Sequence, residues 1–368
     1  MIWEPERLDD QRHLSEGDPG GMLPAVAASA AHVRTGYRTA VESRLDRLAD
    51  HGRPRAIVVA GMGGSGIAGD ILAAAAGNGA PLPIVTLRSY QLPGWVGATD
   101  LVIAVSGSGD TEETLSVATQ AVRRGCSLLG VGPAGSPLEA IAVQASALYV
   151  PVPVTGASRA NIWLLAVPLI VAAAELRFVQ ADAELFERVA KSLEDMAHRC
   201  RPSSESFINP GKSLALDLAE SVPMIWGSSQ AAGVAAYRLV CQLGANAKYP
   251  AVYGELPEVD HNLVEVFDGP LAERDIFADT AGRTLRLVML RDVEEHPQVT
   301  RRRETSLRLA RERDVPVTEL AAEGTHPLER MAGLIALGDY AGTYLALGYG
   351  IDPTPVSAIT EIKARNSQ

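Results

Sequence analysis

Short, continuous apolar runs alternate along the first half of the chain with longer segments in which apolar residues recur at helical spacing. The continuous runs cover residues 56–60, 84–87, 101–105, 127–131 and 147–150. The segments with helical spacing include residues 25–49, 67–76 and 111–124. Continuous apolar strands separated by helices are typical of a parallel sheet that is covered by helices on both faces. The pattern therefore predicts an α/β fold.

The same alternation resumes after about residue 180. Strands are predicted at 222–226, 284–290 and 315–318, and helices at 183–201, 233–243, 299–313 and 327–347. Two successive units of this kind predict two doubly wound, flavodoxin-like parallel-sheet domains in tandem. We assign residues 1–24, which are polar and punctuated by proline and glycine, to an N-terminal arm. The first domain then covers residues 25–180 and the second covers residues 181–368.

Composition narrows the range of partners. The 368 residues are 47% hydrophobic and 21% charged, and the net charge is −11, which argues against a nucleic-acid partner. The N-terminus has no basic region followed by an apolar run, and Pro168 interrupts the longest apolar stretch, 162–176. We therefore expect a cytoplasmic protein without a membrane partner. The three cysteines match no metal-ligand spacing, so no metal is predicted.

The first candidate site is the glycine loop 61–66, which follows a predicted strand and opens a predicted helix. Its sequence is Gly-Met-Gly-Gly-Ser-Gly, in which glycines permit positive φ and the helix N-terminus offers unpaired amides to an anion. The string also satisfies the dinucleotide pattern G-x-G-x-x-G, which expects an acidic residue at the end of the second strand. That strand ends in Leu87-Arg88 instead. A nicotinamide-dependent oxidoreductase is therefore disfavoured.

The second candidate site is the loop 106–111, which places the hydroxyls of Ser106, Ser108 and Thr111 at the start of another predicted helix. Such hydroxyls can cap a helix for stability alone. Two such loops on parallel strands, however, converge at the carboxyl edge of one sheet. We therefore predict one phosphate site, formed by Gly63, Gly64, Ser65, Ser106, Ser108 and Thr111. Neither loop has a P-loop lysine, which disfavours nucleotide hydrolysis.

The pair of loops resembles the SIS (sugar isomerase) domain. The resemblance extends over nearly the whole chain to the bifunctional phosphoglucose/phosphomannose isomerases of archaea and bacteria. The stretches that carry it are 18–23 (DPGGML), 63–70 (GGSGIAGD), 257–262 (PEVDHN) and the tail from 350–353 (GIDP) to 362–363 (IK). It implies a hexose 6-phosphate substrate and an aldose–ketose isomerisation between glucose or mannose 6-phosphate and fructose 6-phosphate, without a metal or organic cofactor.

The resemblance also implies roles for single residues. Arg159, in a Ser-Arg pair where the family has Pro-Arg, would stabilise the reaction intermediate. His261 would open the sugar ring, and in the family this histidine comes from the partner subunit, which implies a homodimer. Lys363 corresponds to the lysine of the family's tail.

The expected catalytic base is missing. In the family this base is the glutamate of an E-N-[AS]-K run sixteen residues before the histidine, and here that position is Ala245 within Gly244-Ala245-Asn246-Ala247-Lys248. An alignment shifted by a residue or two would explain this, although no acidic residue lies between Ser229 and Gly254. Another carboxylate, Glu255, Glu258 or Asp260, is an alternative base. Whether the protein is an active isomerase or a sugar-phosphate-binding or regulatory protein that lost its activity therefore stays open.

Overall fold

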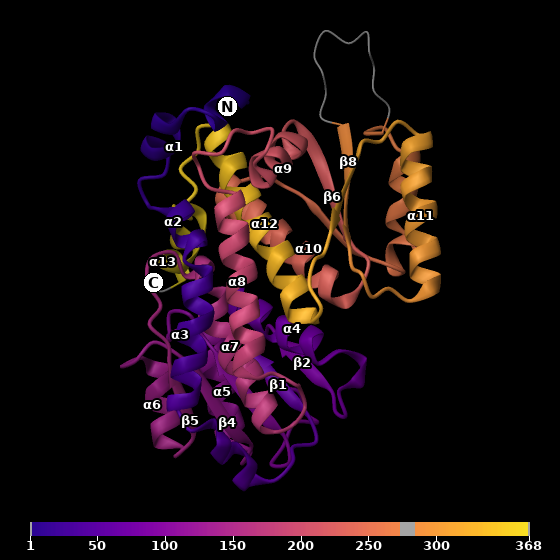
Figure 1. The fold of residues 1–368 in the computed structure, drawn as a ribbon. Helices are drawn as coiled ribbons and strands as arrows, with labels where there is room; N and C mark the ends of the chain where they lie inside the picture. Colours follow the sequence, from indigo (N-terminus) through magenta and orange to yellow (C-terminus); the bar gives the residue numbers. More distant parts are fainter. Residues whose placement is uncertain (1, 273–283, 367–368) are drawn as a thin grey trace. The chain divides into compact units, whose positions relative to one another are not determined.

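The structure, a computed structural model, describes residues 2–272 and 284–366 (Figure 1). Contacts between residues divide the chain into two compact units. The first unit is Ala27–Glu194, and the second unit comprises the residues up to Val26 together with those from Asp195 onward. Each unit contains one parallel sheet with helices packed against it. The predicted α/β class with two parallel sheets is therefore confirmed.

The sheet of the first unit has five parallel strands in the order β2-β1-β3-β4-β5. They are β1 (Ile57–Ala60), β2 (Ile84–Leu87), β3 (Leu101–Val105), β4 (Ser127–Gly132) and β5 (Leu148–Pro151). The central strands β1 and β3 are buried along their whole length, which explains their continuous apolar sequence. The order places β1 next to β3, where the strand order reverses. Ligands of open α/β sheets bind at such a reversal, outside the carboxyl ends of the strands.

Helices cover both faces of this sheet. They are α3 (Ser29–Glu42), α4 (Gly64–Ala76), α5 (Glu112–Arg123), α6 (Pro137–Gln144) and α7 (Ile162–Glu175), and α8 (Ala183–Arg199) follows them. Helix α7 packs against α3 and α4, whereas α5 and α6 pack together over the core of the other face. The single helix predicted over 25–49 is wrong. Helix α3 ends at Glu42, because Arg44 adopts a left-handed conformation (φ 56°) and the Ser43 hydroxyl bonds to the Thr39 carbonyl oxygen.

The sheet of the second unit has four parallel strands in the order β7-β6-β8-β9. They are β6 (Ser221–Gly227), β7 (Val252–Glu255), β8 (Thr284–Arg291) and β9 (Val317–Ala321). The edge strand β7 has no counterpart among the predicted strands. Helix α10 (Gln230–Gln242) lies on one side of β6 and β8 and α11 (Pro297–Glu312) on the other (Figure 1). Because β6 and β7 are parallel, α10 runs from the carboxyl edge of this sheet back to its amino edge.

The remaining helices of the second unit are α1 (Gln11–Gly17), α2 (Met22–Ala27), α9 (Pro210–Leu218), α12 (Pro327–Gly348) and α13 (Ser357–Asn366). A buried ion pair joins α12 to α10, because the Arg238 guanidinium donates two hydrogen bonds, of 3.0 and 2.9 Å, to Asp339. The Gln242 amide donates a third bond to the same carboxylate. Pairing and hydrogen bonding make the burial of these charges tolerable.

Two of the sequence stretches that carry the family resemblance meet in this unit. Asp18 accepts hydrogen bonds from the backbone N–H groups of Met22 and Leu23, which begins α2. A Cβ on Gly20 would lie 2.3 Å from Oγ1 of Thr354, so the turn before α2 touches the tail directly. None of the helices in the described residues is long and apolar enough to span a bilayer.

Candidate functional site

The glycine loop lies where β1 ends and α4 begins. Gly63 has a φ of 53°, in the left-handed region that favours glycine. Gly61 and Gly66, the other two glycines of the G-x-G-x-x-G pattern, are required by close packing. A Cβ on Gly61 would lie 2.8 Å from the backbone carbon of Ser65, because the chain folds back over the helix start. A Cβ on Gly66 would lie 2.8 Å from both the Gly61 carbonyl oxygen and Nε of Arg88. The glycines therefore bring the backbone around Ser65 into a tight turn.

The second loop lies where β3 ends and α5 begins, and its three hydroxyls form a cluster. The Ser106 and Thr111 hydroxyl oxygens are 2.9 Å apart, and each lies 3.4 Å from the Ser108 hydroxyl oxygen. Ser106 is buried, whereas Ser108 is exposed. A hydroxyl can donate one hydrogen bond and accept two, so the cluster can turn its donors toward an anion.

A hydrogen bond joins the two loops, because the Gly107 N–H donates to the Ser65 hydroxyl oxygen at 3.2 Å. Neither α4 nor α5 has a side-chain cap, so the hydroxyls of the second loop do not serve as the cap of α5. In contrast, Ser136 caps α6 and Asn209 caps α9. Two uncapped helix N-termini beside each other offer amide donors and partial positive charge to a phosphate.

Arg159 lies in the turn η4 (Ser158–Ala160), which follows β5. This turn packs on the second loop, since a Cβ on Gly107 would lie 3.5 Å from Cβ of Ser158. Arg159 is half-buried. The structure thus brings together, within the first unit, the two loops and the turn that carries the arginine.

Arg88 lies at the same carboxyl edge of the first sheet, and sequence reasoning did not assign it to the site. It follows β2, its guanidinium lies against Gly66, and it forms an ion pair with Asp70 of α4. The only sequence signal was its position at the end of a strand that neighbours β1.

We predict that Gly66→Ala destabilises the protein, because the added methyl collides with backbone at Gly61 as well as with Arg88. Overpacking of this kind costs about 1–3 kcal/mol, which urea unfolding would measure. The matched control is Gly79→Ala, because a Cβ at Gly79 meets nothing within 4 Å. Equal stability of the two variants would contradict the close packing of the glycine loop.

The corresponding loop of the second unit, Ser228-Ser229 before α10, is filled by the protein's own carboxylate. The Ser229 hydroxyl donates to Asp292 at 2.7 Å and also caps α10 by accepting from the Ala232 N–H. Asp292 forms a buried ion pair with Arg330 at 2.7 Å. This helix N-terminus therefore already has its anion, unlike those of α4 and α5.

The position of the expected base, Ala245, lies in the π-helical turn η5 (Leu243–Ala247), which continues α10. The Ala245 carbonyl oxygen accepts a hydrogen bond of 2.6 Å from Lys248 Nζ, which also donates to the Pro355 carbonyl oxygen in the tail. The turn is at the amino edge of the second sheet, since the Tyr249 hydroxyl just beyond it bonds to the carbonyl oxygen of Ser221, where β6 begins. No carboxylate occupies position 245 in this chain.

His261 lies at the other edge of the same sheet. It ends the turn η6 (Glu258–His261), which follows the carboxyl end of β7, and its side chain is exposed. Strand β7 alone spans about 10 Å between its first and last Cα atoms, at about 3.3 Å per step. Position 245 and His261 therefore lie on opposite edges of the sheet in this chain. Lys363 lies in α13, a helix with no buried residue.

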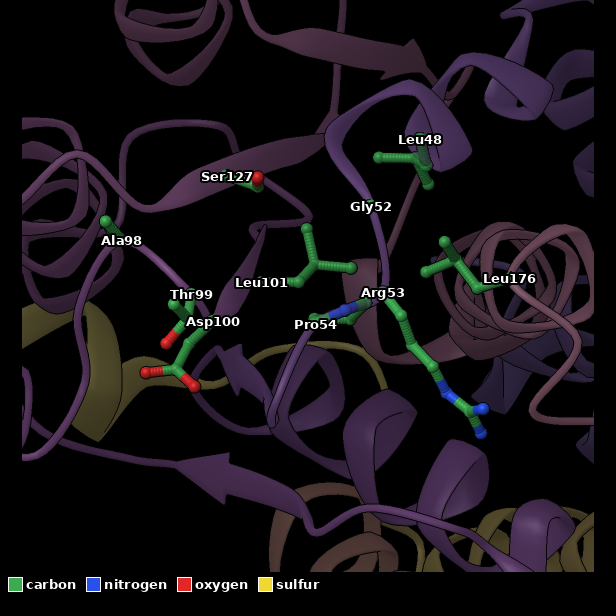
Figure 2. A pocket seen from close by; sticks show the side chains of 10 residues that line it. All are labelled: Leu48, Gly52, Arg53, Pro54, Ala98, Thr99, Asp100, Leu101, Ser127 and Leu176. Atoms are coloured by element: carbon green, nitrogen blue, oxygen red, sulfur yellow. The ribbon is translucent and has the colours of Figure 1, made fainter.

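A small cavity of about 180 Å³ lies elsewhere in the first unit (Figure 2). Its lining includes Leu101 and Ser127, the first residues of β3 and β4, so it opens at the amino edge of the first sheet. The two loops lie at the carboxyl edge, so this cavity is separate from them. The described residues contain no group of three or more histidine, cysteine, aspartate or glutamate side chains able to hold a metal ion.

Parallel α/β units with hydroxyl-rich loops at the carboxyl edge define the SIS class of sugar-phosphate isomerase-like proteins. A family model described as the bacterial phospho-glucose isomerase C-terminal SIS domain matches residues 207–365. The chain resembles the bifunctional phosphoglucose/phosphomannose isomerase of Caldicellulosiruptor bescii, with 31% identity over 83% of this chain and 88% of the relative. The enzyme of the same name from Aquifex aeolicus is 28% identical over 84% and 89% of the two chains. The chain belongs to the bifunctional phosphoglucose/phosphomannose isomerase family.

Solved structures share the fold. A hypothetical protein from Thermus thermophilus aligns with a TM-score of 0.73 and 16% identity, over 99% of this chain and 94% of that one. The tagatose-6-phosphate ketose/aldose isomerase of Escherichia coli aligns with a TM-score of 0.69 and 14% identity, over 90% and 93%. These similarities confirm the SIS-type fold of the described residues.

Proposed function

We propose that the protein binds hexose 6-phosphates and isomerises glucose and mannose 6-phosphate to fructose 6-phosphate. The observation that carries the proposal is the pair of linked loops with two uncapped helix starts and the hydroxyls of Ser65, Ser106, Ser108 and Thr111. This arrangement suits a tetrahedral phosphate, because the two joined loops both offer hydroxyl and amide groups that can donate to its oxygens. The curated relatives carry the names of enzymes that act on these sugar phosphates.

The sugar end of the ligand would be served by Arg159, with its turn packed on the second loop, and by His261 and Lys363. A positively charged guanidinium stabilises the negative charge that develops on the enediolate intermediate. His261 would protonate the ring oxygen as the ring opens.

We infer that the working unit is a homodimer. The family resemblance gives position 245 and His261 to the same sugar, yet within one subunit they lie on opposite edges of the second sheet. A second copy of the chain would supply His261 to the site that contains position 245 of the first. Sedimentation equilibrium would test this, because a strictly monomeric protein with full activity contradicts it.

Binding without turnover is the second candidate function, and Ala245 is the observation that favours it. A methyl group accepts no proton, and loss of general-base catalysis costs roughly 10²–10⁴-fold in rate. The protein would then be a sensor or partner subunit that retains only the phosphate loops.

One pair of assays separates these functions. Interconversion of fructose 6-phosphate with glucose and mannose 6-phosphates would be followed by NMR, and binding of 6-phosphogluconate, a linear sugar-acid phosphate, by calorimetry. Turnover at ordinary enzymatic rates supports the isomerase. Binding with no turnover supports the second candidate, and absence of binding contradicts both.

A further inference from the structure

We propose that Glu255 is the proton-transferring base of this protein and replaces the carboxylate that is missing at position 245. The inference rests on the proposed isomerase function. Three carboxylates lie near His261 in the sequence. Glu255 is at the carboxyl end of β7, and Glu258 and Asp260 are in the turn that follows it.

Two of these three carboxylates are held by residues of α11 or of their own turn. Asp260 accepts a hydrogen bond of 2.8 Å from the Ser306 hydroxyl and pairs with Arg302 of α11 at 3.3 Å. The exposed Glu258 accepts a bond of 2.9 Å from the Asn262 amide, which belongs to its own turn. The oxygens of these two carboxylates are therefore already held by donors of this chain.

Glu255 has a different environment. It ends β7 with its side chain turned toward α10, where a Cβ on Gly233 would lie only 2.6 Å from Oε2. The absence of a side chain at Gly233 makes the room that the half-buried carboxylate occupies. Its hydrogen-bond donor is the Tyr253 hydroxyl at 3.0 Å, and within the described part of the chain it has no ion-pair partner.

This burial has a chemical consequence. Removal from water raises the pKa of Glu255 above its ordinary value, and the Tyr253 hydroxyl offsets only part of that rise. A carboxylate with a raised pKa binds a proton more strongly, and general-base catalysis improves as the pKa approaches the working pH. The half-buried Glu255, set against Gly233, therefore has surroundings that suit proton transfer.

Glu255 and His261 lie at the same edge of the second sheet. Both lie at the carboxyl edge of the second sheet, whereas position 245 lies at the amino edge. In the proposed dimer the subunit that supplies His261 would supply Glu255 with it, so ring opening and proton transfer would come from one subunit.

The step balances without an added reactant. Glu255 removes the proton from C2 of the open-chain aldose, and the electrons of that C–H bond form the C1–C2 double bond while the C1 carbonyl becomes an enediolate oxygen. The C2 hydroxyl proton moves to the C1 oxygen, and the protonated Glu255 returns its proton to C1 as the carbonyl forms at C2. The carboxylate is regenerated, and nothing is oxidised or reduced overall.

Glu255→Gln tests the proposal, because it keeps the shape and the Tyr253 hydrogen bond but removes the basic oxygen. We expect turnover of fructose 6-phosphate to fall roughly 10²–10⁴-fold, with exchange of the C1 hydrogen in D₂O falling in proportion. Calorimetric affinity for 6-phosphogluconate should stay within about threefold, because that ligand needs no base. Glu255→Asp should retain part of the rate, which guards against a folding defect in the glutamine variant.

Glu258→Gln is the matched control, since it removes a neighbouring carboxylate that is bonded to Asn262. It should keep the rate within a few-fold. A glutamine variant at 255 that turns over at the wild-type rate, or an equal loss at 258, overturns the assignment and leaves the isomerase function intact. Wild-type protein that binds 6-phosphogluconate without turnover also overturns it, while absence of binding contradicts the proposed function itself.

Discussion

The double variant Ser65→Ala/Ser108→Ala is expected to lose about 10²–10⁴-fold in affinity for 6-phosphogluconate. It removes one hydroxyl from each loop, and hydrogen bonds to a charged group contribute about 1.5–3 kcal/mol each. Two such bonds amount to about 3–6 kcal/mol, which corresponds to the stated range of dissociation constants. Calorimetry with wild-type and variant protein measures the loss directly, and inorganic phosphate as a second ligand reports on the phosphate end alone.

Two further variants make this result interpretable. Ser116→Ala removes a half-buried serine of α5 whose hydroxyl bonds to the Tyr90 carbonyl oxygen outside both loops, and it should bind like the wild type. Ser108→Ala alone should lose about one to two powers of ten, because it removes a single charge-assisted bond. Unchanged affinity in the double variant would contradict the phosphate site, whether or not the protein is an active isomerase.

The strands of the first unit could be predicted because burial on both faces of the sheet requires continuous apolar sequence. Strands β1 and β3 are buried on both faces and read as continuous apolar runs. The edge strand β7 has no continuous apolar run, since Val252 and Tyr253 are both exposed and only Gly254 is buried. The end of α3 was missed for a related reason, because the left-handed Arg44 is not a residue type that signals a helix end.

The phosphate loops could be predicted because their chemistry is local, with all donors of one loop lying within six residues. The sequence names Glu255 only as one of three alternative bases and gives Arg88 no role in the site, because the surroundings of both come from residues distant in the sequence. Arg88 packs on Gly66 after an intervening helix and strand, and Glu255 packs on Gly233 across a helix and a turn. Likewise, Asp292 fills the loop at Ser229 from 63 residues away. Only the folded chain shows that one helix start already has its anion while two others do not.

Introducing Ala245→Glu into the Glu255→Gln variant should restore isomerase turnover by roughly 10²–10⁴-fold. The substitution returns the carboxylate that the family resemblance expects at this position. Ala245 is half-exposed in η5, so a longer side chain can extend from it without displacing a packed core residue. Initial rates with fructose 6-phosphate, measured for the two single variants and the double variant, give the size of the rescue.

Ala245→Glu alone distinguishes a protein that uses Glu255 as its base from one that has no base. If Glu255 already transfers the proton, a second carboxylate adds little to an otherwise wild-type protein but much to the variant that lacks Glu255. If instead the wild type has no base, Ala245→Glu alone raises turnover by the full factor and Glu255→Gln has no effect. Ala245→Gln, which adds the same length without a basic oxygen, should rescue neither background. A gain from the glutamine variant equal to that from glutamate would show that position 245 acts through shape rather than through proton transfer.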